Sequence, residues 1–224
     1  EMMMSRVAQA VAKAELHFGN IAQQEIWRKK FEDILFKLDF LPNSPTLMNA
    51  GTPRGQLSAC FVLPIEDSLN SIFDTLKLTA MVQQSGGGTG FSFSKLRPKG
   101  EQVSALAGTA SGPVSFMKIF DCTTENIKQG GKRRGANMGI LRVDHPDILE
   151  FIHAKKEGGF TNFNLSIAVT DDFMKAVETH GDFELINPFT RESVQVLKAQ
   201  EIFLEIVHGA WSTGDPGQIG RAHV

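Results

Sequence analysis

The fold class is decided by residues 138–186, which read MGILRVDHPDILEFIHAKKEGGFTNFNLSIAVTDDFMKAVETHGDFELI. Short runs of branched apolar residues alternate in this stretch with segments whose apolar residues recur at helical spacing. The pattern predicts a strand, a helix, a strand, a helix and a strand over residues 138–143, 146–156, 164–169, 171–179 and 183–186. Strands that alternate with helices are typical of an α/β architecture with largely parallel pairing. The pattern does not choose between an open sheet and a barrel.

The same alternation extends outward on both sides. Upstream, the sequence predicts a buried strand at 58–63, a long helix capped by Asp67 or Ser68, a strand at 91–96 and a helix that runs from Pro113 to about residue 129. The long helix is expected to bury one apolar face, made of Leu69, Ile72, Phe73, Leu76 and Ala80. Downstream, residues 199–212 predict a further helix.

The beginning of the chain has a different character. Residues 2–18 and 23–38 predict two helices, and the prolines at 42 and 45 are expected to stop the second one. We therefore expect an N-terminal helical segment over residues 1–40 and an α/β domain over residues 41–217.

Composition and charge exclude several classes of function. Lysines and arginines number 23 against 25 aspartates and glutamates, and this formal net charge of −2 argues against bulk binding to nucleic acid or a membrane surface. No apolar run approaches the roughly 20 residues that span a bilayer, and the N-terminus lacks the layout of a signal peptide. The six histidines and two cysteines show neither metal-ligand spacing nor a disulfide framework. We expect a cytoplasmic protein without a metal site in this chain.

Two glycine-rich segments are candidates for ligand contact. The first, Gly86–Gly90, lacks the Gly-Lys-Ser/Thr of a Walker loop and does not follow a strand, so its spacing alone favours a helix end over an anion site. The second, residues 129–137, reads QGGKRRGAN and sets three consecutive cations between glycines. Such a loop suits phosphates or the edge of a nucleotide base, and a solvated basic turn explains the same residues equally well.

The two cysteines are interpreted from their surroundings. Cys60 lies in the apolar run 58–63, and Cys122 lies in the middle of a predicted helix. Most buried cysteines pack without reacting, so the residues alone favour inert packing for both.

Five blocks, in one order along the chain, resemble the catalytic large-subunit family of ribonucleotide reductases. They are LPNSPTLMNAG (41–51), SACFVLP (58–64), Asp67-Ser68, GGGTG with SKLRP (86–90 and 94–98), and QGGKRRGANM (129–138). The last block is most similar to the class II enzymes, which depend on adenosylcobalamin. The resemblance implies N-terminal helices followed by roughly the first half of a ten-stranded α/β reductase barrel. It implies reduction of ribonucleotides to 2′-deoxyribonucleotides by thiyl-radical chemistry.

The resemblance also implies roles for individual residues. Cys60 would be one of two cysteines that reduce the ribose 2′ position and are reset by a thioredoxin-like reductant. Ser44 would contact the substrate diphosphate, and Ala59, Cys60 and Gly88 would line the nucleoside. Deoxynucleotide or ATP effectors would bind to Asp67, Ser68, Leu69, Arg97, Val103, Lys132 and Arg133.

Within that effector site, Asp67 would bind the deoxyribose, Arg97 the triphosphate, and Arg133 would bridge toward the substrate. The loop Lys132–Met138 would then couple effector and substrate. A homodimer through the helices that carry the site is expected from the resemblance alone.

The sequence departs from the family pattern in two respects. This sequence has no counterpart of three features that the resemblance implies: the radical-bearing cysteine, the partner of Cys60 and most residues expected around the cobalamin. We therefore expect a fragment that is inactive alone. Residues 218–224 are expected to be a non-native tail, because Ile219–Val224 resembles a translated adapter sequence.

Two other functions stay open on the sequence. One is a class I large subunit, whose radical comes from a metal-containing partner subunit. The other is a non-catalytic module that senses deoxynucleotides through the glycine and arginine loops.

Overall fold

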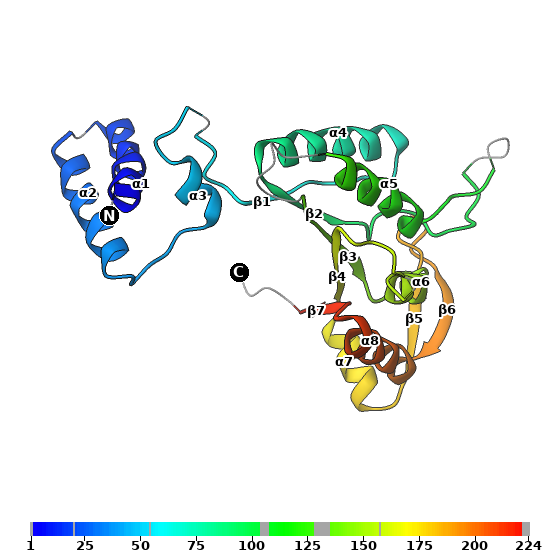
Figure 1. Ribbon diagram of the computed structural model, residues 1–224. Coiled ribbons are helices and arrows are strands. Elements are labelled where there is room, and N and C mark those ends of the chain that lie inside the picture. Colours follow the sequence, from blue (N-terminus) through cyan, green and yellow to red (C-terminus); the bar gives the residue numbers. More distant parts are fainter. Residues whose placement is uncertain are drawn as a thin grey trace. The chain divides into compact units, whose positions relative to one another are not determined.

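A computed structural model of the chain describes residues 2–19, 21–53, 55–103, 108–127, 135–156 and 158–220. The chain divides into two compact units, Glu1–Phe61 with Ser85–Gly87, and Val62–Gln84 with Gly88–Val224. The first unit is helical, and the second is built on a sheet (Figure 1). The division falls near residue 61, whereas the sequence analysis places a boundary at residue 40.

The helical unit contains two long helices and a short third one. α1 spans Met2–Ala12 and continues as the 3-10 helix Lys13–Phe18, α2 spans Ile21–Phe36, and α3 spans Ser44–Asn49. Arg6 on α1 donates hydrogen bonds to the carbonyls of Leu47 and Ala50, which ties α1 to α3. The two predicted helices are confirmed, and their buried core consists of Val7, Ala8, Leu35 and Ala50.

α3 is absent from the sequence prediction, which interprets Pro42 and Pro45 only as a stop. Pro45 lies in the first turn of α3, where its missing N–H has no helical partner to lose. Oδ1 of Asn43 accepts a hydrogen bond from the N–H of Thr46 at 2.9 Å and caps the helix. Asparagine followed by proline at this spacing is therefore also a start signal.

The second unit is built on a five-stranded sheet in the order β1-β2-β3-β4-β7. β2, β3, β4 and β7 pair in parallel, and Thr89 on β2 lies opposite Asn137 on β3. Each strand of this sheet lies beside the next one in the chain, so each parallel pair needs a crossover connection. The predicted parallel α/β architecture is confirmed. The strands are β1 (Cys60–Val62), β2 (Gly88–Ser92), β3 (Asn137–Arg142), β4 (Phe163–Ala168) and β7 (Gly217–Ile219).

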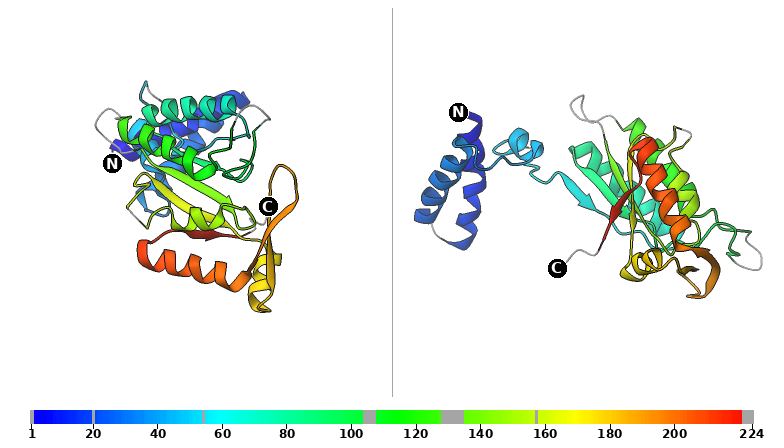
Figure 2. Two further views of the ribbon diagram at one scale, coloured as in Figure 1. Left: turned by 90° about the vertical axis from the view of Figure 1, so that its right-hand side faces the viewer. Right: turned by 90° about the horizontal axis from the view of Figure 1, so that it is seen from below.

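Helices form the connections of the sheet (Figure 1). α4 (Leu69–Ser85) lies between β1 and β2, α5 (Pro113–Asn126) between β2 and β3, and α6 (Ile148–His153) between β3 and β4. α7 (Asp171–Glu178) and α8 (Ala199–Thr213) both lie between β4 and β7. α4 and α5 run side by side (Figure 2). Among the helices described, none has both the length and the apolar character to cross a membrane.

Phenylalanines dominate the core of this unit. Phe91 from β2, Phe120 from α5 and Phe163 from β4 are buried, and the ring centroids of Phe91 and Phe120 lie 4.9 Å apart. A Cβ added to Gly139 on β3 would lie 3.2 Å from the ring of Phe163. The glycine therefore leaves room for the aromatic cluster that joins two strands to α5.

A separate antiparallel hairpin, β5 (Asp182–Ile186) with β6 (Ser193–Lys198), lies between α7 and α8. The strand predicted at 183–186 is confirmed as a strand, but it does not belong to the parallel sheet. β6 is absent from the prediction, although its alternating sequence SVQVLK is typical of a strand with two different faces.

One prediction about burial is wrong, and another holds only in part, since Ile72 on α4 is buried as predicted and Leu76 packs against the core. The strand expected at 58–63 is shorter, and none of its three residues is buried; Val62 is 86% exposed. β1 is the edge strand of the sheet, where fewer elements cover a side chain. On α4, Leu69 and Phe73 are 62% and 49% exposed, while the buried residues are Ile72, Thr75, Thr79 and Gln83. α4 buries a largely polar face because that face finds hydrogen-bond partners in the unit, as described below.

The boundaries of β2 and β7 bear on two further expectations. β2 begins at Gly88, so Gly88 to Gly90 are strand residues rather than part of a loop. Gly217, Gln218 and Ile219 form β7 and pair with β4, while residues 221–224 lie outside the described part of the chain. Whether residues 218–224 are a non-native tail stays a prediction.

Candidate nucleotide site

The segment that leads into α4 is held by side-chain hydrogen bonds. Oγ of Ser68 accepts a hydrogen bond from the N–H of Ser71 at 3.2 Å and caps the helix, as predicted. Oγ of Ser71 accepts from the N–H of Glu66 at 3.0 Å, and Thr75 donates its hydroxyl to the carbonyl of Pro64 at 2.7 Å. This bonding fixes the backbone on both sides of Asp67.

Asp67 and Arg97, which the sequence places 30 residues apart, form an ion pair. Nε of Arg97 lies 2.7 Å from Oδ2 of Asp67, and the backbone N–H of Arg97 donates to Oδ1 at 3.2 Å. Both side chains are about one-fifth exposed. Within the described residues, the guanidinium of Arg97 makes its hydrogen bond to protein through Nε, so its Nη groups face no acceptor there. The pair places the guanidinium of Arg97 beside a carboxylate, with about one-fifth of each side chain exposed.

The tip of the β5–β6 hairpin covers Arg97. The guanidinium carbon of Arg97 lies 5.0 Å from the ring centroid of Phe189, within the range of a cation–π contact. Oδ1 of Asn187 accepts from the N–H groups of Phe189 and Thr190 at 2.8 and 3.2 Å, and its Nδ2 donates to Glu101 at 2.8 Å. The turn around Asn187 thus holds Phe189 in place. Phe189 is 64% exposed and is missing from the predicted site, where only the Asn-Pro turn signal marks its neighbourhood.

Val103 lies on a short ladder beyond Arg97. Its N–H donates to the carbonyl of Gly108 at 3.1 Å, and Gln102 pairs with Thr109 in an antiparallel bridge. Leu69, at the first turn of α4, is largely exposed. Five of the predicted effector residues therefore lie in the second unit, around the start of α4 and after β2. They are Asp67, Ser68, Leu69, Arg97 and Val103.

A buried histidine supports the segment that carries Arg97. Nε2 of His145 lies 2.8 Å from the carbonyl of Leu96, and its Nδ1 accepts from the N–H of Asp147 at 3.0 Å. Oδ2 of Asp147 in turn accepts from the N–H of Lys99 at 2.9 Å. Burial lowers the pKa of His145 and raises the pKa of Asp147. A neutral imidazole that donates from Nε2 satisfies both of its contacts.

The remaining predicted residues are only partly described. Lys132 and Arg133 lie outside the described residues, which resume at Gly135. Ser44, Ala59 and Cys60 belong to the first unit, with Ser44 and Cys60 exposed, whereas Gly88 belongs to the second. Since these four residues are divided between the units, their arrangement as a substrate site stays a prediction. The expectation that Cys60 is buried is wrong, because β1 is an uncovered edge strand.

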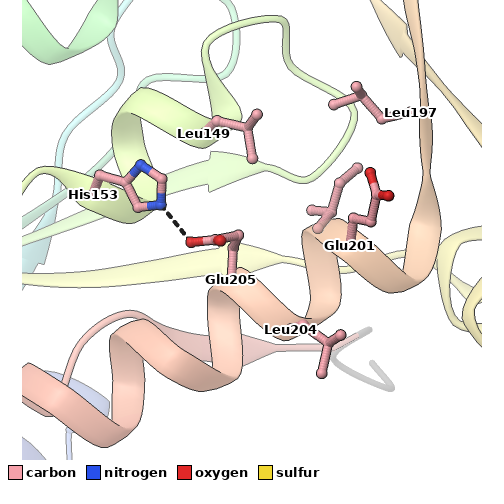
Figure 3. Close-up of a pocket in the computed structure, with 7 residues that line it drawn as sticks. Leu149, His153, Leu197, Glu201, Leu204 and Glu205 are labelled. Atoms are coloured by element: carbon pink, nitrogen blue, oxygen red, sulfur yellow. Dashed lines mark hydrogen bonds and ion pairs between the residues drawn. The ribbon is translucent and has the colours of Figure 1, made fainter.

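A cavity lies between α6, β6 and α8 (Figure 3). His153 and Glu205 point toward each other across it, with Nε2 and Oε2 2.7 Å apart, and this hydrogen bond lowers the pKa of Glu205. The described residues contain no cluster of three or more histidine, cysteine or carboxylate side chains suited to a metal ion. The cavity is about 390 Å³ and is lined by Leu149, His153, Leu197, Glu201, Ile202, Leu204 and Glu205.

Comparison with known proteins covers both units. The family model described as "Ribonucleotide reductase, barrel domain" matches residues 58–223, and the one described as "Ribonucleotide reductase, all-alpha domain" matches residues 1–55. A vitamin B12-dependent ribonucleoside-diphosphate reductase of Thermoplasma acidophilum is 59% identical over 85% of this chain and 25% of its own length. A protein of the same name from Mycobacterium tuberculosis is 49% identical over 97% of this chain and 32% of its own length.

More distant relatives carry a different description. A ribonucleoside-diphosphate reductase large chain of Neurospora crassa is 34% identical over 79% of this chain and 22% of its own length. The chain thus spans about a quarter to a third of the B12-dependent relatives named above. The all-alpha family model matches the helical unit, and the barrel model matches the parallel α/β unit that follows it in the sequence. The chain belongs to the large-subunit family of ribonucleotide reductases.

Proposed function

We propose that the protein to which this chain belongs reduces ribonucleoside diphosphates to 2′-deoxyribonucleoside diphosphates in the cytoplasm. The observation that carries this proposal is the similarity of the chain to two proteins named vitamin B12-dependent ribonucleoside-diphosphate reductase. The order of the five sequence blocks and the parallel sheet both support it. The relative named as a large chain is less similar, which favours the B12-dependent form over the form with a metal-radical partner.

Cys60 is the proposed source of one reducing thiol. In the net reaction the 2′-hydroxyl leaves as water and hydrogen takes its place, while two thiols give up two electrons and two protons and become a disulfide. A dithiol reductant of the thioredoxin type then returns the disulfide to two thiols. Exposure of Cys60 supports this exchange, because a second thiolate must reach its sulfur. Cys122 on α5 is exposed as well, but it lies in the other unit and has no role in the proposal.

Adenosylcobalamin is the proposed cofactor of the whole protein, for which it would supply the radical. The cavities measured among the described residues, of about 300 to 390 Å³, are at the small end of the roughly 300–1,000 Å³ of small-molecule sites. A corrin ring with its nucleotide tail does not fit them. We assign none of the described residues to that group.

The effector is proposed to bind at Asp67 and Arg97. The Asp67 carboxylate would accept a hydrogen bond from a deoxyribose hydroxyl, and the guanidinium of Arg97 would pair with the triphosphate. Ser68, Leu69 and Val103 would line the sugar and base, and Lys132 and Arg133 would carry the base signal toward the substrate. Support comes from the ion pair, which holds both groups together before any ligand is present.

The exposed apolar side of α4 supports a homodimer. Leu69, Phe73 and Met81 are exposed on the helix that begins at the proposed effector site. The sequence pattern treats part of this side as core, and a second copy of the protein would bury it. We therefore propose that α4 contributes to a subunit interface.

Turnover by a full-length protein that carries this sequence tests the proposed function. We expect reduction of ribonucleoside diphosphates that requires adenosylcobalamin and a dithiol reductant. Cys60→Ser should abolish turnover with that reductant, whereas Cys122→Ser should retain it. Activity only with a metal-loaded partner subunit would assign the class I form. Binding of deoxynucleoside triphosphates without turnover under either condition would refute the enzyme and leave a deoxynucleotide sensor.

A further inference from the structure

The aromatic ring of Phe189 lies against the guanidinium of Arg97, and none of the proposed roles uses it. The guanidinium carbon lies over the ring, 5.0 Å from its centroid. A single exposed apolar side chain on a protein surface needs no functional explanation. Phe189, however, is 64% exposed and lies beside the cation that is proposed to pair with the effector triphosphate. The bonds that hold the ring there decide whether the contact is incidental.

The turn at the tip of the β5–β6 hairpin holds the ring from within. Asn187 is buried, and its Oδ1 accepts hydrogen bonds from the N–H groups of Phe189 and Thr190, an arrangement that asparagine often makes in turns. Its backbone closes the same turn, because its N–H donates to the carbonyl of Glu192 at 2.9 Å and its carbonyl accepts from the N–H of Arg191 at 2.9 Å. Asn187 therefore fixes the chain on both sides of Phe189.

Two further contacts tie this hairpin to the segment that carries the arginine. Beyond the arginine, Nδ2 of Asn187 donates to the carboxylate of Glu101 at 2.8 Å. Before it, the N–H of Ile186 donates to the carbonyl of Asp144 at 2.7 Å. The next residue, His145, bonds through Nε2 to the carbonyl that directly precedes the arginine, at 2.8 Å. The hairpin tip is thus anchored on both sides of the guanidinium, and the position of the ring is built into the fold.

The two partners of Arg97 act on it in different ways. The carboxylate of Asp67 bonds to Nε and offsets part of the positive charge. The ring of Phe189 attracts the cation through its negative face and adds no net charge. A second carboxylate in this place would repel phosphates, whereas the ring leaves the cation free to attract them. An arginine that is held on two sides also loses less rotamer freedom when it binds a phosphate, so more of the contact energy appears as affinity.

We propose that Phe189 is a positioning residue for the effector triphosphate, and that it acts by holding the guanidinium of Arg97 in place before the effector binds; this inference rests on the proposed function. The ring does not need to touch the nucleotide, because it acts through the arginine. The β5–β6 hairpin contributes no strand to the parallel sheet. Its function is then to complete the effector site with an aromatic support for the phosphate-binding cation.

Three substitutions in a full-length protein that carries this sequence test the proposal. Phe189→Leu keeps an apolar side chain and removes the aromatic face. Phe189→Tyr is the conservative variant, because it keeps the ring. Val194→Ala is the matched control, since Val194 is an apolar residue of the same hairpin, on β6, and is 52% exposed. Phe189→Leu is also combined with Arg97→Gln, which removes the cation through which the ring is proposed to act.

The readout is the Kd of 2′-deoxyadenosine triphosphate and of 2′-deoxythymidine triphosphate, a purine and a pyrimidine probe, measured by equilibrium dialysis. We expect Phe189→Leu to raise both Kd values by a similar factor of about two to ten, the cost of ordering one rotamer-rich side chain. Phe189→Tyr and Val194→Ala should bind both probes as the unsubstituted protein does. In the Arg97→Gln background, Phe189→Leu should have no further effect. A ring that only stabilised the hairpin would weaken binding by the same factor in both backgrounds.

The outcomes separate this inference from the proposed function. If Arg97→Gln weakens binding of both probes and Phe189→Leu does not, the positioning role of Phe189 is refuted and the proposed effector site stands. Equal effects of Phe189→Leu with and without the arginine would refute it as well, because the ring would then not act through Arg97. If the unsubstituted protein binds neither probe, or binds both equally well in Arg97→Gln, the proposed effector site is refuted and the positioning role with it.

Discussion

Replacement of Asp67 by asparagine tests the ion pair on which the nucleotide site is built. The substitution keeps the shape of the side chain and removes its charge. Asparagine can still accept one hydrogen bond, but its NH₂ group would face a donor of Arg97, either Nε–H or the backbone N–H. One of the two contacts is therefore lost whichever way the amide turns.

The magnitude follows from the geometry of the pair. A hydrogen bond to a charged group contributes about 1.5–3 kcal/mol, and an exposed ion pair only about 0–1 kcal/mol. The Asp67 and Arg97 side chains are about one-fifth exposed, so the pair lies between these cases. We expect Asp67→Asn to lower the free energy of unfolding by about 1–2 kcal/mol, with a coupling to Arg97→Gln of about 1 kcal/mol in a double-mutant cycle.

Urea unfolding followed by circular dichroism measures both quantities. With a slope of about 1–3 kcal/mol per molar urea, the midpoint should fall by roughly 0.3–2 M. Lys37→Met is the control, since Lys37 and Asp33 form an exposed pair at the end of α2 and its loss should change the midpoint little. Additive effects of Asp67→Asn and Arg97→Gln would show that the two groups do not interact in solution, and the proposed effector anchor would lose its structural basis.

Three further predictions concern the rest of the second unit. Burial lowers the pKa of His145, so its contribution to the unfolding free energy is complete above the ordinary pKa of about 6.5 and is lost as the pH falls through the lower folded-state pKa. His145→Gln should therefore flatten the fall in unfolding free energy between about pH 7.5 and pH 5.5. An unchanged slope would contradict the buried neutral imidazole. Asp215→Ala should lower the unfolding free energy by about 2–4 kcal/mol, because the mostly buried Asp215 accepts from Lys155 at 2.5 Å and from the N–H of Leu165 at 3.0 Å. Lys198→Met, which removes an exposed ion pair with Asp182, should lower it by about 1 kcal/mol or less. Equal effects of the two substitutions would refute the role of burial. Gly139→Ala should cost about 1–3 kcal/mol in urea unfolding, because its methyl group would lie 3.2 Å from Phe163 and 3.3 Å from Met117, and a neutral result would show that the cluster can repack.

The elements that the sequence predicts well are those whose signals are local. α7 begins where the pattern places it, because Oγ1 of Thr170 accepts from the N–H of Phe173 at 3.1 Å and two aspartates occupy the first turn. β3 and β4 follow from runs of branched apolar residues that are buried in the middle of the sheet. In these places propensity, capping and burial favour the same structure.

The nucleotide site depends instead on contacts that are remote in sequence. Nδ2 of Asn187 donates to Glu101 across 86 residues, and this bond brings Phe189 to Arg97. No periodicity links these residues, so the hairpin and its exposed aromatic side chain are absent from the prediction. Asp67 and Arg97 enter the prediction by family resemblance, and only the structure shows that they pair with each other.

The face of α4 that packs inward shows why the hydrophobic pattern fails on this helix and what the failure indicates. Thr75 and Thr79 satisfy their hydroxyl groups with the carbonyls of Pro64 and Thr75, so their burial is compensated within the segment. Gln83 is different, because its buried Oε1 has no partner among the described residues and leaves a cost of about 1–3 kcal/mol against a typical net stability of roughly 5–15 kcal/mol. Its amide nitrogen is satisfied by Asn137 at 2.8 Å and Thr124 at 3.1 Å. The hydrophobic pattern fails on this helix because it counts apolar residues and takes no account of polar side chains that are buried together with their hydrogen-bond partners.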